Sequence, residues 1–282
     1  MGKQSYRRWA VNAAAAVLAF GMMFFLTFHG RTGDLEPLRA EIVTFGDSVF
    51  GEVRDETAVP ARLQEMTGVS VYNAALGSTC MARTDKSARV GYTRDALSMA
   101  GLAKAVWAGD FGTHYAMRMR ESNMEYFGEV IQDLEAVDFS QTKVVLIQQG
   151  VNDYHKGTPI ENPRDPYDEY TFLGAVRTAV EALRRVNPSL RIILVTPTFS
   201  WYHTTGLTCE QADYGGGVLE DYVEAEIRVA EELGIEVIDV YHDFYPHESF
   251  GDWELYTRDG LHPNEAGREK LAGRIAEELG VF

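Results

Sequence analysis

The stretch KVVLIQQGVND at Lys143–Asp153 decides the fold class of this chain. Its first six residues, Lys143–Gln148, are almost wholly apolar, a pattern typical of a strand that is buried on both faces of a parallel sheet. Gly150 then interrupts the run, and the polar side chains of Asn152 and Asp153 follow it. In open parallel sheets, ligands bind at the carboxyl ends of the strands, so the loop after this strand is a candidate site.

Outward from this strand, apolar runs alternate with segments of helical periodicity. The alternation predicts one doubly wound α/β domain, because parallel strands joined by helices bury both faces of their sheet. Further strands are expected at residues 41–45, 69–75, 191–195 and 235–240, and helices at 57–66, 96–107, 124–137, 172–186, 218–233 and around 271–279.

The composition of the 282 residues is that of a globular protein, with 45% hydrophobic and 24% charged residues. It excludes disordered, collagen-like and coiled-coil classes. The formal net charge is −16, and no run rich in Lys or Arg follows residue 40. We therefore expect no nucleic-acid partner, because binding to phosphates requires a basic surface.

The N-terminal segment Trp9–Phe28 carries no charge over twenty residues. At about 1.5 Å per residue, a helix of this length spans a hydrocarbon core of roughly 30 Å. Basic residues precede it, at Lys3, Arg7 and Arg8, so the positive-inside rule places the chain after Gly30 outside the membrane. We favour an uncleaved anchor over a cleaved signal peptide, because no A-x-A-like site ends the run. A buried core helix is a third interpretation. The expected organisation is a cytoplasmic N-terminus and anchor at 1–30, a linker at 31–40, and an extracytoplasmic domain at 41–282.

Two loops that follow strands carry residue types that acyl transfer needs. Ser48 lies in Gly46–Asp47–Ser48 after the first strand, where a serine at a strand-to-helix turn can expose its hydroxyl as a nucleophile. Asn152 could donate to a developing oxyanion. Each has a plainer interpretation, since serine and asparagine are also common turn residues.

A third motif, Asp259–Gly–Leu–His262–Pro263, lies near the C-terminus. The i, i+3 spacing lets the carboxylate of Asp259 reach Nδ1 of His262, which leaves Nε2 free to accept a proton from a serine. An isolated D-x-x-H sequence can equally be a surface turn.

In combination, these motifs resemble the SGNH (GDSL-type) hydrolase family. The matching blocks are GDS at Gly46–Ser48, NAALG at Asn73–Gly77, GVND at Gly150–Asp153 and DGLHP at Asp259–Pro263. The resemblance implies a flavodoxin-like three-layer α/β/α sandwich with a five-stranded parallel sheet in the order 2-1-3-4-5.

The resemblance also implies roles for single residues. Ser48 would be the nucleophile, His262 the general base and Asp259 the acid that orients it. The Ser48 N–H, the Gly77 N–H and the Asn152 side chain would form the oxyanion hole. We expect neither a cofactor nor a metal.

The expected function is hydrolysis of an acyl ester through Ser48, with an acylated small molecule or glycan as substrate. We favour a short-chain or carbohydrate O-deacetylase, and keep a lipid or long-chain ester hydrolase, an acyltransferase and a catalytically idle glycan-binding module as alternatives. Trp201 and Tyr202, in the loop after the fourth strand, are candidates for stacking on substrate. Packing of that loop against the domain explains these two aromatic residues equally well.

Three further features leave alternatives open. Cys80 and Cys209 could form a disulfide only if the fourth loop folds back over the site, and otherwise remain two thiols. His242 and His247 could belong to a metal site, although no companion ligand pair is recognisable. The segment 81–123 contains several arginines and is either a substrate-facing cap or a peripheral decoration. The arginines of this segment are Arg83, Arg89, Arg94, Arg118 and Arg120.

Overall fold

The structure is a computed structural model that describes residues 36–84, 97–112 and 126–280. Residues 38–282 form one compact unit, separate from residues 1–37. The apolar segment Trp9–Phe28 and most of the arginines of 81–123 lie outside the described residues. No helix within the described ranges is long and apolar enough to cross a membrane. The anchor therefore stays a prediction.

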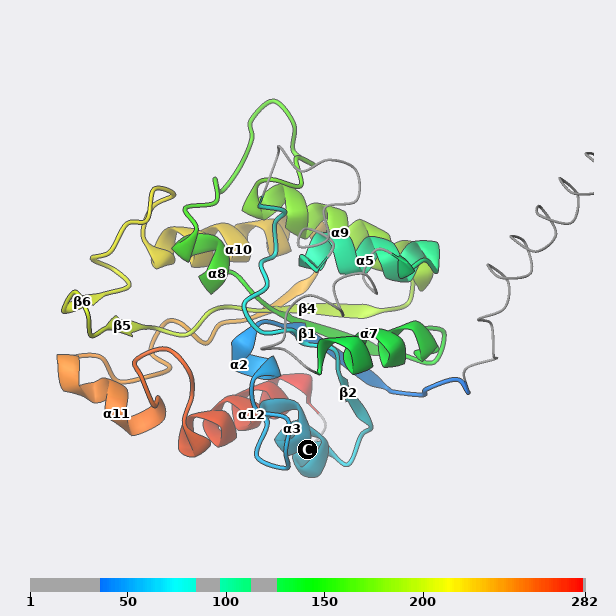
Figure 1. The fold of residues 1–282 in the computed structure, drawn as a ribbon, viewed down its shortest axis with the longest axis horizontal. Helices are drawn as coiled ribbons and strands as arrows, with labels where there is room; N and C mark the ends of the chain where they lie inside the picture. Colours follow the sequence, from blue (N-terminus) through cyan, green and yellow to red (C-terminus); the bar gives the residue numbers. More distant parts are fainter. Residues whose placement is uncertain (1–35, 85–96, 113–125, 281–282) are drawn as a thin grey trace, which may run out of the picture. The chain divides into compact units, whose positions relative to one another are not determined.

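Five parallel strands form the central sheet, in the order β2-β1-β3-β4-β7 (Figure 1). This is the expected order, with β7 as the fifth strand. The strands are β1 (Ile42–Gly46), β2 (Val71–Asn73), β3 (Val144–Gln148), β4 (Arg191–Val195) and β7 (Glu236–Ile238). β1 and β3 pair along their full length, from Ile42 opposite Val144 to Gly46 opposite Gln148. Both edge strands, β2 and β7, are shorter than the predicted 69–75 and 235–240.

Helices cover both faces of this sheet, which confirms the α/β sandwich (Figure 1). On one face, α9 packs against both α5 and α10, and on the other face α12 packs against α3. The main helices are α3 (Val59–Thr67), α5 (Met99–Ala108), α7 (Phe127–Ala136), α9 (Phe172–Val186), α10 (Leu219–Leu233) and α12 (Glu265–Leu279). The apolar stripe of α9 is buried as its periodicity predicted, and the Thr171 hydroxyl caps its first turn by accepting from the N–H of Gly174.

Short elements follow the carboxyl ends of the strands. They are α2 (Ser48–Gly51), α8 (Val151–His155), β5 (Trp201–Tyr202), β6 (Leu207–Thr208), η1 (Phe250–Asp252) and α11 (Trp253–Tyr256). The antiparallel ribbon β5-β6 was not predicted, since two residues per strand are too few to show a period. It lies within the long loop 196–217, and its strand β5 contacts the Asp259–His262 turn.

The last helix begins earlier than its apolar residues indicated. The side chain of Asn264 caps α12 by accepting from the N–H of Gly267 at 3.0 Å, so the helix starts at Glu265. This start lies directly after the D-x-x-H-P motif. The motif is therefore held between the end of α11 and the first turn of α12.

Candidate active site

Ser48 is the first residue of α2, and only Asp47 separates it from the end of β1 at Gly46. The carboxylate of Asp47 caps this short helix, because its Oδ1 accepts from the N–H of Val49 at 2.9 Å. Asp47 is fully buried, and burial raises its pKa to about 7. As an N1 residue, Ser48 has an N–H with no partner inside the helix and a side chain that is only partly buried.

Asp259 and His262 form the contact that their spacing predicted. Nδ1 of His262 lies 2.8 Å from Oδ2 of Asp259, and Oδ1 of the same carboxylate accepts from the N–H of Leu261 at 3.1 Å and of His262 at 2.8 Å. Partial burial acts to raise the pKa of Asp259, but these hydrogen bonds outweigh it and hold the pKa below its usual value. An ionised carboxylate at Nδ1 keeps a proton on that nitrogen and leaves Nε2 as the acceptor.

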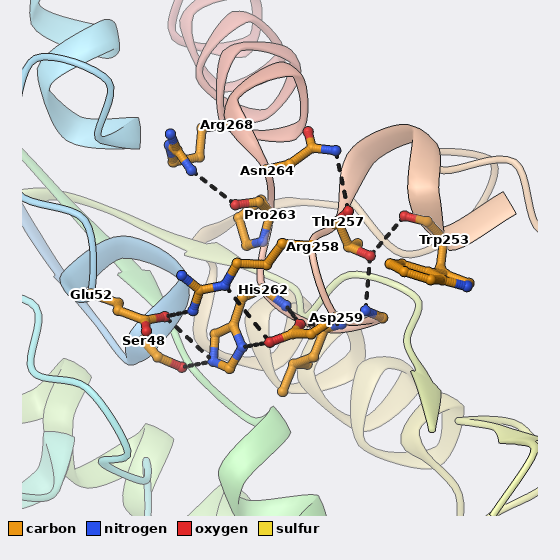
Figure 2. Close-up of polar contacts among 12 residues, drawn as sticks. Ser48, Glu52, Trp253, Thr257, Arg258, Asp259, His262, Pro263, Asn264 and Arg268 are labelled. Carbon is orange, nitrogen blue, oxygen red and sulfur yellow. Dashed lines mark hydrogen bonds and ion pairs between the residues drawn. The ribbon is translucent and has the colours of Figure 1, made fainter. Parts of the chain in front are cut away.

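The fold brings this pair to Ser48 across more than two hundred residues of sequence. Nε2 of His262 lies 3.0 Å from Oγ of Ser48 (Figure 2). The serine hydroxyl can therefore donate to Nε2 while Asp259 holds the far side of the ring. This is the geometry of a nucleophile paired with a general base.

Neighbouring elements hold the Asp259–His262 turn in place (Figure 2). The hydroxyl of Thr257 accepts from the N–H of Gly260 at 3.0 Å, and the N–H of Trp201 in β5 donates to the carbonyl of Gly260 at 2.8 Å. The amide of Asn264 donates to the carbonyl of Thr257 at 3.2 Å. Contacts from β5 and from the cap of α12 therefore fix the histidine's position.

The two other groups expected at the oxyanion hole already have partners. The N–H of Gly77 donates to the hydroxyl of Tyr126 at 2.9 Å. Nδ2 of Asn152 donates to the carbonyl of Thr79 at 3.0 Å and lies 3.4 Å from Oδ2 of Asp47. An incoming carbonyl oxygen would have to compete with these partners for the donors.

Two side chains of the matched blocks anchor the loop that carries Gly77. The amide of Asn73 donates to the carbonyl of Phe50 at 2.9 Å, which ties the end of β2 to α2. The buried carboxylate of Asp153 accepts from the N–H groups of Met81 and Ala82, at 2.8 and 2.9 Å. Burial raises the pKa of Asp153 to about 7.

Trp201 does not have the substrate-stacking role considered above. Its side chain is only 1% exposed and packs edge-to-face on Phe199, so it belongs to the core of the domain. Packing of the loop, the alternative left open, therefore explains this tryptophan. Tyr202 is partly buried, and its hydroxyl lies 3.0 Å from Nε2 of His155. Burial, with repulsion from His262, lowers the pKa of His155 to about 4.

The sequence analysis missed two charged residues beside the contact of Ser48, His262 and Asp259. Glu52 and Arg258 form an ion pair, and Oε2 of Glu52 lies 3.7 Å from Nε2 of His262 (Figure 2). Glu52 follows Ser48 by four residues, which places both on one side of a helical turn, and this spacing was an available signal. Tyr126 had no comparable signal, because only the tertiary fold brings it to Gly77.

The cysteines and the remaining histidines have separate environments. Cys80 and Cys209 are both buried free thiols, so they do not form the disulfide considered above. The ammonium of Lys156 contacts Sγ of Cys80 at 3.1 Å. His247 stacks on an aromatic ring, and His242 pairs with a carboxylate on its own loop. In the described ranges, no three His, Cys, Asp or Glu side chains are grouped so that they could hold a metal.

Comparison with known proteins places the chain in a family. The GDSL-like lipase/acylhydrolase family model matches residues 43–270, which include all the groups described above. The chain belongs to this family, and it is an SGNH-type enzyme that acts on ester bonds. No curated protein matches the chain in sequence.

Solved structures show the same fold at low sequence identity. A protein from Lactobacillus plantarum is 16% identical with a TM-score of 0.58, over 87% of this chain and 98% of its own. A protein from Chitinophaga pinensis, described as a possible lipase, is 19% identical with a TM-score of 0.55, over 86% of this chain and 99% of its own.

Proposed function

We propose that the chain hydrolyses an acyl ester through a covalent intermediate on Ser48. The observation that carries this proposal is the continuous contact from Ser48 Oγ to His262 Nε2 at 3.0 Å and from His262 Nδ1 to Asp259 Oδ2 at 2.8 Å. In the first step, Oγ bonds to the acyl carbon and its proton passes to Nε2. The bond between the acyl carbon and the alcohol oxygen then breaks, and that oxygen takes the proton from Nε2.

The second step releases the acyl group from Ser48. A water molecule bonds to the acyl carbon and gives a proton to Nε2, the bond to Oγ breaks, and Oγ regains a proton from Nε2. In both steps the negative charge on the former carbonyl oxygen needs donors. We assign them to the N–H groups of Ser48 and Gly77 and to Nδ2 of Asn152.

We propose a short-chain or carbohydrate O-ester as the substrate class. The net charge of −16 disfavours strongly anionic polymers. A charged and half-exposed ion pair, Glu52 with Arg258, lies next to the reacting histidine, which favours a polar substrate over a purely apolar one.

One observation favours lipid or long-chain esters as a second candidate. Phe250 and Leu255 are exposed, and they lie in η1 and α11, the segment that leads into the Asp259–His262 turn. An acyl chain could lie against such side chains. A p-nitrophenyl ester series of acetate, butyrate and octanoate separates the candidates, because preference for octanoate would support the second.

Substitution of Ser48 tests the proposal. Ser48→Ala is expected to abolish turnover of p-nitrophenyl acetate and labelling by a fluorophosphonate probe. Asn152→Ala is expected to lower kcat by about 10²–10³, as the loss of an oxyanion donor does elsewhere. If Ser48→Ala keeps its turnover, Ser48 is not the nucleophile. A wild type that neither labels nor turns over would support the idle binding module instead.

A further inference from the structure

The ion pair of Glu52 and Arg258 lies against the reacting edge of His262 (Figure 2). Glu52 directly follows α2, and Arg258 directly precedes Asp259. Nη2 of Arg258 donates to Oε2 of Glu52, and Nε of Arg258 lies 3.7 Å from Oδ2 of Asp259. The side chains of Glu52 and Arg258 are 44% and 43% exposed, so the pair is open to solvent beside the nucleophile.

The chemistry of the proposed mechanism places the leaving alcohol at this pair. Nε2 of His262 must protonate the alcohol oxygen, so that oxygen has to come within about 2.6–3.2 Å of Nε2. The same nitrogen lies 3.7 Å from Oε2 of Glu52. The first carbons of the alcohol, rather than the acyl chain, must therefore lie beside Glu52 and Arg258.

The pair has hydrogen-bonding capacity left for a ligand. The three contacts described above use Oε2 of Glu52 and use Nη2 and Nε of Arg258. Oε1 of Glu52 and Nη1 of Arg258 take part in none of them. A hydroxyl next to the leaving oxygen can donate to the carboxylate or accept from the guanidinium, and such charge-assisted bonds are the stronger class. The alkyl group of a simple alcohol would displace water from Glu52 and Arg258 but could not replace the hydrogen bonds that this water makes.

The charge of the alcohol is constrained in the same way. A carboxylate or phosphate on the alcohol could pair with Arg258, but it would also lie against the carboxylate of Glu52 in a chain of net charge −16. A cationic alcohol would compete with Arg258 for a carboxylate that is already paired. A neutral alcohol with several hydroxyl groups satisfies both partners.

We propose that Glu52 and Arg258 form a leaving-alcohol subsite that selects neutral polyhydroxy alcohols. This inference rests on the proposed Ser48 mechanism and extends it by naming the alcohol side of the substrate. Sugars and glycerol share the required chemistry, and the experiment separates them.

The experiment compares acetate esters that differ only in their alcohol, using the full chain. The esters are propyl acetate, glycerol monoacetate and a 6-O-acetylated methyl glucoside. Since kcat/KM reports all steps through acylation, the ratio of each polyol ester to propyl acetate isolates recognition of the alcohol. We expect wild-type ratios of about tenfold or more, the size of a charge-assisted hydrogen bond. If the ratio for the glucoside exceeds that for glycerol monoacetate, the substrate is a sugar ester. If the ratio for glycerol monoacetate is the larger, the substrate is a glycerol ester.

Two variants remove the subsite from opposite sides. Glu52→Gln keeps the guanidinium of Arg258, and Arg258→Met keeps the carboxylate of Glu52, so each variant removes one of the two charged partners. In both variants the two ratios are expected to fall at least about threefold. The matched control is Glu236→Gln, which removes a carboxylate of similar exposure, 51%, from the ion pair with Arg191 at the amino-terminal ends of β4 and β7. Its ratios are expected to equal those of the wild type.

The ratios distinguish a subsite from a structural ion pair. A merely structural role would lower kcat/KM for all three esters together and leave the ratios unchanged, and that result overturns the inference. A wild type that shows no preference for either polyol ester also overturns it, while Ser48-dependent hydrolysis of propyl acetate would still support the proposed function. If no ester shows Ser48-dependent turnover, the proposed function and the subsite fail together.

Discussion

The hydroxyl of Tyr126 accepts a hydrogen bond from the N–H of Gly77, one of the donors of the proposed oxyanion hole. The N–H of Gly77 donates to it at 2.9 Å, and the ring lies under the guanidinium of Arg54 at 4.7 Å. Burial raises the pKa of Tyr126, so the phenol stays neutral at ordinary pH. A neutral hydroxyl that accepts this hydrogen bond competes with the carbonyl oxygen of an ester.

Replacement of Tyr126 by phenylalanine should release this donor. We expect Tyr126→Phe to raise kcat/KM for p-nitrophenyl acetate about two- to tenfold, because the net value of one neutral hydrogen bond is about 0.5–1.5 kcal/mol. Steady-state kinetics of the two proteins measure the effect. The control is Tyr72→Phe, which removes a hydroxyl that donates to the carbonyl of Val130 in α7 and should leave kcat/KM unchanged. A fall in kcat for Tyr126→Phe would instead show that the phenol assists the reaction.

At the scale of elements, the turn between Asp259 and His262 depends on close contact with β5. Gly260 has a φ of +90°, and a Cβ at this position would lie 2.3 Å from the carbonyl oxygen of Trp201. A side chain here must therefore move either the turn or the β5-β6 ribbon. The buried position of Trp201 thus contributes to the site through its backbone rather than through its ring.

Gly260→Ala should lower activity more than it lowers stability. We expect kcat to fall at least about tenfold, since displacement of His262 by about 1 Å weakens proton transfer from Ser48. Activity on p-nitrophenyl acetate and the thermal midpoint are the measurements. The control is Gly273→Ala in α12, where a Cβ meets no atom within 4 Å. It should keep full activity and gain about 0.5–1 kcal/mol of stability. Full activity in Gly260→Ala would show that the turn can shift without cost.

At the scale of the whole molecule, the core contains a buried acid that has no hydrogen-bond partner among the described residues. Glu226 on α10 is fully buried, and neither carboxylate oxygen has a hydrogen-bond partner in the described part of the chain. Burial, with repulsion from Asp153 and Asp239, raises its pKa well above 4.5. The folded state therefore holds this proton more tightly than the unfolded state. The contribution of Glu226 to stability is present below about pH 4.5 and is lost as the pH rises through the folded-state pKa.

Glu226→Gln should remove this pH dependence. We expect the unfolding free energy of the variant, relative to that of the wild type, to increase between about pH 5 and pH 8. In this range unfolding of the wild type becomes easier, because Glu226 can release its proton once it is exposed, whereas glutamine does not titrate. Urea denaturation at several pH values gives the difference. The control is Glu231→Gln, on an exposed position of the same helix, for which the difference should stay constant. A constant difference for Glu226→Gln would contradict the assignment of a buried, protonated acid.

The location of the protein in the cell is also predicted at the scale of the whole molecule. From the uncharged segment Trp9–Phe28 we expect the full chain to sediment with membranes, with the domain after Gly30 accessible to protease from outside. Residues 38–282, a compact unit by themselves, should fold and turn over p-nitrophenyl acetate without the N-terminal segment. A shortened protein in the soluble exported fraction would indicate cleavage of this segment. Protease accessibility only from the cytoplasmic side would contradict the orientation.

The sequence by itself determined the sheet, the main helices and the residues of the serine–histidine–aspartate contact. Apolar runs such as Lys143–Gln148 specify buried strands because a parallel sheet leaves no face for polar side chains. The contact of Asp259 with His262 was predictable because it spans only three residues. Their approach to Ser48 followed from the resemblance to a family, and from the rule that sites lie at the carboxyl ends of parallel strands.

The tertiary structure decided which local motifs become part of the site. The chain contains a second D-x-x-H sequence, and Asp239 Oδ2 lies 2.7 Å from Nδ1 of His242, as close as the equivalent pair at the site. Nε2 of His242 faces Glu224 at 3.6 Å, whereas Nε2 of His262 meets the hydroxyl of Ser48. The spacing of a D-x-x-H sequence sets the contact between its carboxylate and Nδ1 of its histidine. The partner of Nε2 on the other side of the ring depends on packing between elements far apart in the chain. The same reason explains why the burial of Trp201, the hydroxyl of Tyr126 and the ion pair of Glu52 with Arg258 emerged only from the fold.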